Sequence, residues 1–214
     1  LPDWASGYLH ALGAVFFMPE ALAGLAVAVV LLLHSRILFL LSLVGWGVAV
    51  AMAGLLTGSY VDAFRAPGAF NHVLTAMALG GVFLVPSRKS LVFASIAVVL
   101  SSILAQATAV FWASFGIPVF TLPFIATVIP LLYFLGVSGY PGLVRVLRRT
   151  PEEAVCYAAA EAERFRDRIR PLALPFSGRW TVFQGFNGKW THKENHRHAY
   201  DFIITDEGGA HHRG

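Results

Sequence analysis

The chain has 214 residues, of which 57% are hydrophobic and 13% are charged, and its formal net charge is +4 at pH 7. This composition is too apolar for an ordinary soluble domain of this length. The single cysteine, Cys156, excludes an internal disulfide and a thiolate metal cluster, and we interpret it as a small buried residue on a helix face.

The charges are unevenly placed along the chain. They are few between Met18 and Val137 and dense after Leu143. We therefore predict a membrane domain followed by a polar region that is not embedded in the membrane. Because Leu1 is not an initiator methionine and no basic segment precedes an apolar one, we see no signal peptide and expect a piece of a longer protein.

The membrane domain begins with a segment that is too short to span. Residues 2–17 are interrupted by Asp3, Gly7, His10 and Gly13, which favours a re-entrant helix over a spanning one. Several of the spans that follow are short, which predicts tilt, local thinning of the bilayer or shielding by neighbouring helices. We predict five spans, at residues 20–34, 37–56, 69–84, 91–115 and 117–137.

The second of these spans is rich in small residues. Such residues permit close approach between helix backbones in a membrane, so we expect tight packing here and infer nothing about a substrate. They are Gly45, Gly47, Ala51, Ala53 and Gly54.

The connectors between the spans predict an orientation. With five spans, most basic residues of the connectors fall on one side of the membrane, and the other side carries only Arg65, which Asp62 offsets. The positive-inside rule therefore places the basic side, and with it the C-terminus, in the cytoplasm. Basic residues beside a membrane are explained by the positive-inside rule or by binding to anionic lipid, so they do not indicate nucleic-acid binding. With five spans, the residues on the basic side are Arg36, Arg88, Lys89 and the arginines of 145–149.

The region after the membrane domain divides into two parts. Thr150-Pro151-Glu152-Glu153 is a capping box that opens a charged helix running to about Ile169. Strands are predicted at 179–186 and 198–205, with Asn187-Gly188 as a turn. The predicted domains are thus a membrane domain at 1–140, a basic juxtamembrane segment and linker helix at 141–176, and an incomplete β region at 177–214.

The predicted fold class is an all-α membrane protein with a re-entrant pore helix and five transmembrane helices, followed by a helical linker and an incomplete β domain. Its most informative stretch is residues 116–124, in which Thr121 lies between Pro118 and Pro123. Each proline removes a backbone N–H and frees nearby carbonyls, and such backbone at membrane depth must be buried or line a wet cavity. Thr121 is either a polar station in an apolar pathway or a hydroxyl that bonds back to its own helix.

Two aromatic residues extend this hypothesis. Phe17 ends an apolar run, and Phe70 lies one turn before Leu74 on a single helix face. Facing aromatics form a slot that accepts a thin planar solute, with hydroxyls or carbonyls replacing the water that the solute sheds. The alternative is that each aromatic is a core or lipid-facing residue.

These residues belong to three separated motifs that resemble the bacterial urea transporter family. The resemblance covers residues 2–137 and fits one of the family's two inverted repeats, more closely the second, so that the first would precede Leu1. The motifs are Val15-Phe16-Phe17, Phe70-Asn71-x-x-Leu74 leading to Leu79-Gly80-Gly81-Val82-Phe83, and Ile117-Pro118-x-x-Thr121-x-Pro123-Phe124.

The resemblance implies a passive, channel-type path for urea or a similar small amide, formed together with the missing first repeat. Phe17 and Phe70 would stack on the solute, Val15 and Leu74 would complete the apolar wall, and Thr121 would hydrogen-bond urea at the narrow middle. The family implies no cofactor for transport, a homo-oligomer with a pore in each protomer, and a bacterial inner membrane.

One position departs from the family. At Ala14 the family usually carries a carboxylate or amide that accepts from urea, and alanine cannot do so. The exact solute therefore stays open. His10 and His72 are the ionisable groups nearest this path, and we interpret both as hydrogen-bonded packing residues because neither matches a pore residue of the family.

A second resemblance lies in the C-terminal region. Thr191-His192 followed by Ala199-Tyr200-Asp201-Phe202 resembles the start of M23-type, lysostaphin-like zinc metallopeptidases, which implies that His192 and Asp201 are the first two zinc ligands. The family's downstream His-x-His is absent, so we expect zinc only in a complete domain and no activity in this piece. The alternative function is a membrane-anchored peptidase acting on peptidoglycan, although such an enzyme belongs outside the cytoplasm. Read without the resemblance, the cluster is a set of surface histidines.

Overall fold

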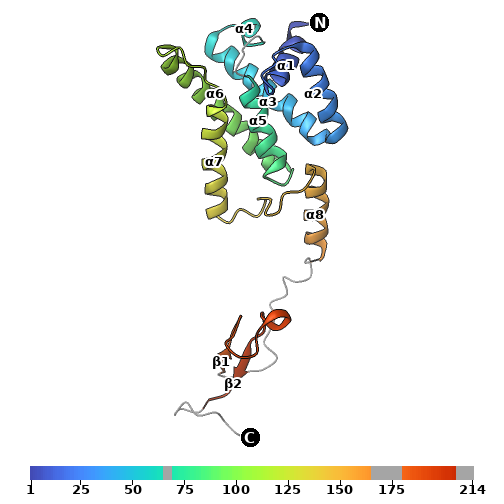
Figure 1. The fold of residues 1–214 in the computed structure, drawn as a ribbon, viewed down its shortest axis with the longest axis vertical. Helices are drawn as coiled ribbons and strands as arrows, with labels where there is room; N and C mark the ends of the chain where they lie inside the picture. Colours follow the sequence, from blue (N-terminus) through green and yellow to red (C-terminus); the bar gives the residue numbers. More distant parts are fainter. Residues whose placement is uncertain (65–68, 165–179, 206–214) are drawn as a thin grey trace. The chain divides into compact units, whose positions relative to one another are not determined.

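The computed structural model describes residues 1–64, 69–164 and 180–205. The chain divides into two compact units, Leu1–Arg166 and Asp167–Gly214. The first unit is helical, and the second contains a small sheet (Figure 1).

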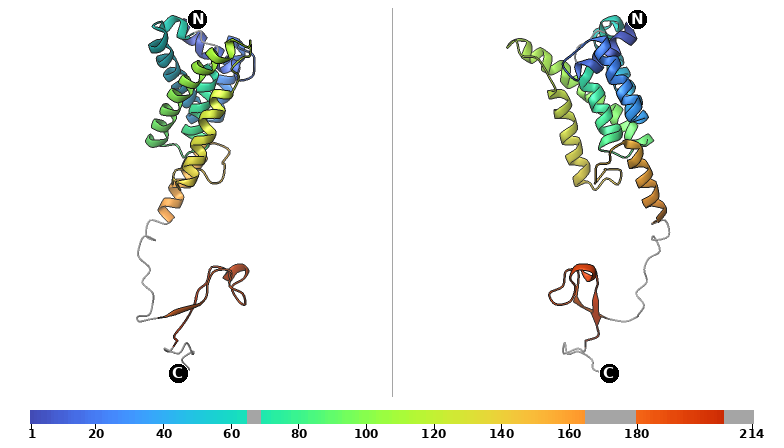
Figure 2. Two further views of the ribbon diagram at one scale, coloured as in Figure 1. Left: turned by 90° about the vertical axis from the view of Figure 1, so that its left-hand side faces the viewer. Right: turned by 45° about the vertical axis from the view of Figure 1, so that its right-hand side comes forward.

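The helical unit follows the predicted order of elements closely. Helix α5 packs against α3 on one side and α6 on the other, and α7 returns along α6 (Figures 1 and 2). The described helices are α1 (Asp3–Ala14), α2 (Ala21–His34), α3 (Arg36–Thr57), α4 (Tyr60–Phe64), α5 (Ala69–Met77) with the π-helix η1 (Ala78–Val82), α6 (Arg88–Ala113), α7 (Leu122–Val137) and α8 (Pro151–Arg164).

Two helices of the described chain, α3 and α6, are long and apolar enough to cross a membrane. The other predicted spans are shorter apolar helices, at Ala21–His34, Ala69–Val82 and Leu122–Val137. The mostly helical class is therefore confirmed and is consistent with a helical membrane protein, while the number of crossings stays a prediction.

The fifth span was predicted to begin too early. Residues 117–121 are not regular helix, and α7 begins at Leu122. Gly116 and Phe120 have φ of +64° and +45°, both in the left-handed region, and Pro118 and Pro123 interrupt the pattern of helical donors. The first segment likewise ends its helix at Ala14 because the chain turns there, with Phe17 at a φ of +59°.

Short elements escaped the sequence analysis. Helix α4 has only five residues, and its Phe64 ring stacks on Trp46 of α3 with centroids 5.9 Å apart. The π-helix η1 replaces the last turn of α5 at Gly80 and Gly81, where the Leu41 side chain packs directly against the glycine backbone. A single π turn within an α-helix is a known local variation, and the spacing of hydrophobic residues does not predict it.

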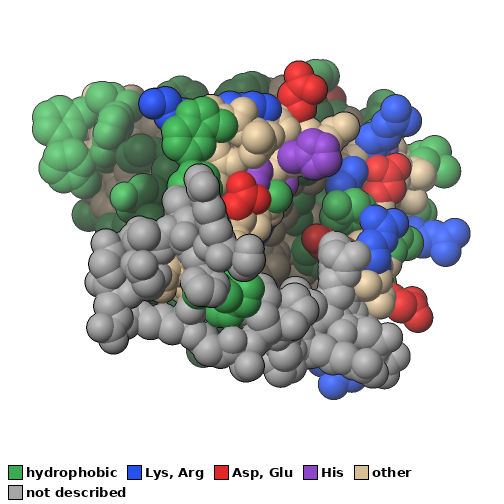
Figure 3. Space-filling view, turned by 90° about the horizontal axis from the view of Figure 1, so that it is seen from below, with side chains coloured by type: hydrophobic (Ala, Val, Ile, Leu, Met, Phe, Trp, Pro, Cys, Tyr) green, Lys and Arg blue, Asp and Glu red, His purple; other side chains and the backbone are tan. Residues whose placement is uncertain are grey.

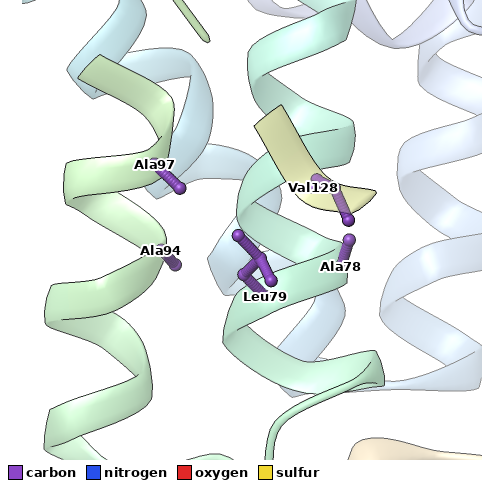
Figure 4. Close-up of a cluster of buried hydrophobic side chains, with 5 residues drawn as sticks. All are labelled: Ala78, Leu79, Ala94, Ala97 and Val128. Atoms are coloured by element: carbon purple, nitrogen blue, oxygen red, sulfur yellow. The ribbon is translucent and has the colours of Figure 1, made fainter. Parts of the chain in front are cut away.

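The interior of this unit is built from small side chains. One cluster joins Ala78 and Leu79 to Ala94 and Ala97 of α6 and Val128 of α7, and Figure 4 shows these side chains converging from the three helices. A second cluster contains Tyr8, Leu12, Ala28 and Val73. Small buried residues let the helix backbones approach closely, as in membrane proteins generally.

The large apolar side chains lie mainly on the outside. Leu33 of α2, Val110 of α6 and Tyr133 of α7 are 82%, 75% and 75% exposed. Figure 3, an end-on view from below Figure 1, likewise shows hydrophobic side chains at the surface of the described residues, next to charged ones. This distribution suits a surface that faces lipid, because lipid tails solvate such side chains.

The glycines predicted to allow close packing do so selectively. A Cβ at Gly45 would lie 2.7 Å from both the His72 carbonyl oxygen and the Ala76 Cβ, so α3 and α5 touch there. A Cβ at Gly47 would have nothing within 4 Å. Gly45 is therefore required by packing, whereas Gly47 is not.

Helix α8 begins at the predicted capping sequence with one change. The Thr150 hydroxyl accepts from the Glu153 backbone N–H at 3.3 Å, but the Glu153 carboxylate accepts from the backbone N–H of Arg149 instead of that of Thr150. Residues 165–169, where this helix was expected to end, lie outside the described residues. Cys156 is exposed on α8, so its interpretation as a buried residue was wrong.

The C-terminal unit contains one antiparallel strand pair. Strands β1 (Thr181–Gln184) and β2 (Asp201–Ile203) are shorter than predicted, and a bulge interrupts their register between Val182 and Gln184. The predicted turn exists, with Asn187 at a φ of +53°, but sixteen residues separate the strands. They include a 3₁₀ turn at Glu194–His196.

Candidate functional site

A cavity of about 380 Å³ lies within the helical unit. Its wall is mostly small and apolar, which leaves room between helices that are otherwise closely packed. The apolar lining includes Ala49, Val50 and Ala53 of α3, Ala63 of α4, and Ala105 and Ala109 of α6.

Two of the predicted pore residues line this cavity. Phe17 follows α1 and is 74% exposed, and Phe70 lies in the first turn of α5 and is half-buried. The segment 118–120, which precedes Thr121, lines the same space. The structure thus brings together three stretches that are far apart in the sequence.

The other three predicted residues do not line the cavity. Val15 is half-buried just after α1, Leu74 is half-buried one turn beyond Phe70, and Thr121 is the half-buried N-cap residue of α7. The Thr121 hydroxyl makes no capping hydrogen bond, so the bond back to its own helix that we considered is not formed. Thr127, one turn into α7, does make such a bond, to the Pro123 carbonyl at 2.7 Å.

The polar part of the lining is small. It consists of Asn71 and His72 of α5 and Ser102 and Gln106 of α6. Among the described residues that line the cavity, none is an aspartate, glutamate, lysine or arginine. An apolar space with a few amide and hydroxyl groups suits a small neutral solute with hydrogen-bonding capacity, and it offers an ion nothing to replace its hydration.

Comparison with known protein families identifies the chain. A family model described as "Urea transporter" matches residues 1–136, which is more than half of the chain. The chain belongs to the urea transporter family. A search of curated proteins finds no match. Family membership establishes a membrane-integral protein whose function is passive urea transport.

Asn71 lines the cavity of this urea transporter, and its role was not predicted from the sequence. Asn71 is 1% exposed, and its Nδ2 donates to the Phe120 carbonyl at 2.8 Å. It thereby joins α5 to the loop before α7. Asn71 belongs to the motif Phe70-Asn71-x-x-Leu74, and an amide next to a predicted pore residue could have indicated a polar role. Gln106, which is exposed but lines the same cavity, was a further signal, because a polar residue inside an apolar span is costly unless it reaches a polar or wet site.

The two membrane histidines differ in this transporter. His10 is exposed, and its Nδ1 donates to the Ser6 carbonyl of its own helix at 2.6 Å, since a carbonyl can only accept. His72 is 7% exposed and lines the cavity. His10 therefore has a local contact, while His72 adjoins the proposed path.

The C-terminal unit brings His192 and Asp201 together. His192 Nε2 lies 3.1 Å from Asp201 Oδ1, and His192 Nδ1 lies 2.8 Å from the Gly185 carbonyl, to which it must donate. His192 is 4% exposed, unlike His196 and His198, which lie on the surface. Within the part of the chain that the structure describes, no three His, Cys, Asp or Glu residues form a metal-binding group.

Proposed function

We propose that urea crosses the membrane through the cavity lined by Phe17 and Phe70. The observation that supports this path is the meeting of these two aromatic residues in one largely apolar space beside the loop that leads to Thr121. The family match assigns urea to the chain as a whole, and the cavity supplies a place for it.

The chemistry of urea suits this arrangement. Urea is planar, with π-faces above and below and N–H donors in its plane, so Phe17 and Phe70 stack on its faces in the cavity. Val15 and Leu74, which lie outside the cavity lining, would restrict the width of the path beyond it. The Thr121 hydroxyl, which caps nothing, replaces part of the lost water at the narrow point. No charge moves and no proton is transferred, so the flux follows the urea gradient.

The test is urea flux into proteoliposomes, measured by stopped-flow light scattering on the full-length protein. Thr121→Val keeps the side-chain shape and removes the hydroxyl, and we expect urea flux to fall by about tenfold, the effect of losing one hydrogen bond at the narrowest point. Thr127→Val is the matched control, because that hydroxyl is bonded to Pro123 within the same helix. Equal fluxes in the two variants would remove Thr121 from the path.

The assembly is a further part of the proposal. The helical unit acts as one inverted repeat of a two-repeat pore, in a homo-oligomer in a bacterial inner membrane with the C-terminus in the cytoplasm. Cys156 is exposed and is the single cysteine of the sequence, so a membrane-impermeant maleimide reports its side. If the maleimide labels Cys156 from the outside of intact cells, the C-terminus is extracytoplasmic and the proposed orientation is wrong.

The geometry of His192 and Asp201 supports a second, separate proposal: we propose that these two residues are zinc ligands in the C-terminal unit. His192 Nε2 and Asp201 Oδ1 converge as two ligands do, since tetrahedral ligands at about 2.0–2.1 Å from zinc lie about 3.3 Å apart. The hydrogen bond of Nδ1 to Gly185 orients the ring, as outer-shell partners of metal-binding histidines do. The described residues supply two ligands and a catalytic zinc needs three, so we assign no hydrolytic step.

Zinc content distinguishes this pair from an ordinary histidine–carboxylate contact. We expect the purified full-length protein to carry zinc and His192→Ala to lose it, as measured by elemental analysis after dialysis. A metal-free wild type would contradict the proposal and leave urea transport untouched.

A further inference from the structure

Asn71 combines two features that rarely occur together in a packed interior. Its side chain is 1% exposed, and its Oδ1 is buried without any donor. An asparagine amide carries two donor hydrogens and an oxygen that can accept twice, yet Nδ2 makes one bond, to Phe120. A buried acceptor that receives no hydrogen bond loses the free energy of its hydration and gains nothing in return.

The position of this acceptor gives it a use. Asn71 lines the cavity directly after Phe70, and Phe120, its partner through Nδ2, lines it as well. The rest of the wall is largely apolar, so a solute that leaves water finds few acceptors there. Ala14, the last residue of α1, offers none from its side chain.

The Nδ2 bond has a separate consequence. Phe120 has a φ of +45°, a conformation that side-chain-bearing residues seldom adopt, and its carbonyl is held by Asn71. The held loop leads directly into Thr121 and α7. One side chain therefore fixes the loop with its nitrogen and leaves its oxygen for something else.

We propose that Asn71 Oδ1 accepts a hydrogen bond from an N–H group of urea in the cavity and so makes Asn71 a specificity-determining residue of the transporter. This inference rests on the proposed path through the cavity. Urea has four N–H hydrogens and matches an unpaired acceptor, whereas a solute without N–H or O–H groups would leave it unpaired. Asn71 thus performs the acceptor role for which Ala14 has no group.

The experiment separates the oxygen from the nitrogen. Urea flux into proteoliposomes of the full-length protein is measured as a function of urea concentration, which gives a half-saturating concentration and a maximal flux. Asn71→Leu removes both polar atoms with little change in size, and Asn71→Asp keeps an acceptor at Oδ1 but loses the donor to Phe120. Ser101→Ala is the control, because its Oγ is also buried without a partner but Ser101 does not line the cavity.

We expect Asn71→Leu to raise the half-saturating concentration of urea about two- to tenfold, the effect of one hydrogen bond on affinity. Asn71→Asp should stay within about twofold of wild type in this quantity while its maximal flux falls, because the loop is no longer held. Ser101→Ala should match wild type in both. Thermal unfolding of each purified variant reports whether it is folded, and Asn71→Asp tests the inference by itself if Asn71→Leu does not fold.

Two results would overturn the inference. If both Asn71 variants lower the maximal flux and neither changes the half-saturating concentration by more than Ser101→Ala does, Asn71 only holds the loop. A large rise in the half-saturating concentration in Asn71→Asp, equal to that in Asn71→Leu, would likewise exclude an acceptor role. Wild-type flux no faster than that of empty liposomes would instead remove the proposed path, and the inference with it, before any variant is measured.

Discussion

The two units of this chain build their interiors in different ways. In the helical unit the buried side chains are mostly alanine, glycine and serine, and the large apolar side chains face outward. In the C-terminal unit Val182, Phe183 and Trp190 are exposed, while Gln184 and His192 are buried. One interior depends on close backbone approach, and the other depends on hydrogen bonds between polar side chains.

Two buried amides make the contrast concrete. Gln184 Nε2 donates to the Thr191 hydroxyl at 2.6 Å and to Asp201 at 3.2 Å, and its Oε1 accepts from the Trp190 backbone N–H at 3.0 Å. Asn71 makes one such bond and leaves its oxygen unpaired. A fully bonded amide stabilises a fold, whereas a partly bonded one beside a cavity has capacity left for a solute.

The largest expected effect comes from breaking the close approach in the helical unit. Gly45→Leu places a side chain where α3 and α5 touch, and we expect it to destabilise the protein by about 3 kcal/mol, the upper end for overpacking, because the neighbours are backbone and Ala76. Gly47→Leu, two residues along the same helix, meets open space and should have little effect. Thermal unfolding in detergent measures both, and similar melting temperatures would show that the helices do not depend on this contact.

The location of Gly45 also shows what the sequence can and cannot predict. Its small neighbours predicted close helix packing in general, and apolar periodicity placed the spans within a few residues. The start of α7 was missed because left-handed backbone at Phe120, a residue other than glycine, is stabilised by a bond from Asn71, which lies 49 positions away. Local pattern cannot encode a partner so distant in sequence.

The same limit applied to the candidate site. Phe17 and Phe70 were predicted from motifs and do line one cavity, but the cavity itself is a product of packing between four helices. The sequence shows that Gln106 and Asn71 are polar residues within apolar segments, but only the fold shows that both line this cavity. His192 and Asp201, which the sequence analysis named together, do lie 3.1 Å apart, with Asp201 at the start of β2, and their role as zinc ligands stays a proposal.

The second largest expected effect tests the hydrogen-bonded interior of the C-terminal unit. Gln184→Leu keeps the volume of the side chain and removes three hydrogen bonds, which leaves Asp201 and the Trp190 N–H without this partner. We expect a loss of about 2 kcal/mol in the stability of the C-terminal unit. Faster amide hydrogen exchange in β1 and β2 measures this loss, and urea flux should be unchanged. Unchanged exchange would mean that the strands are held by other contacts.

The smallest effect concerns a polar contact within the helical unit, between α8 and the start of α3. The Glu152 carboxylate of α8 accepts from the Ser35 hydroxyl and the Ile37 backbone N–H, both at 3.0 Å, at the start of α3. Burial raises the pKa of Glu152, but hydrogen bonds from the backbone N–H groups of Ile37 and Glu152 and from the Ser35 and Thr150 hydroxyls together lower it more, so the net shift is downward. A carboxylate bound in this way connects α8 to the first turn of α3.

The sign of the pH dependence follows from that shift. Because the pKa of Glu152 is lower in the folded protein, its contribution is fully present above the ordinary glutamate pKa of about 4.3 and is lost as the pH falls through the lowered value. We expect Glu152→Gln to cost about 1 kcal/mol at pH 7 and to remove this part of the acid sensitivity. Hydrogen exchange at the start of α3 and in α8, measured at pH 7 and near pH 4, checks both effects. If acid loosens α8 equally in wild type and Glu152→Gln, the contact of Glu152 with α3 does not stabilise α8, and packing holds this helix in place.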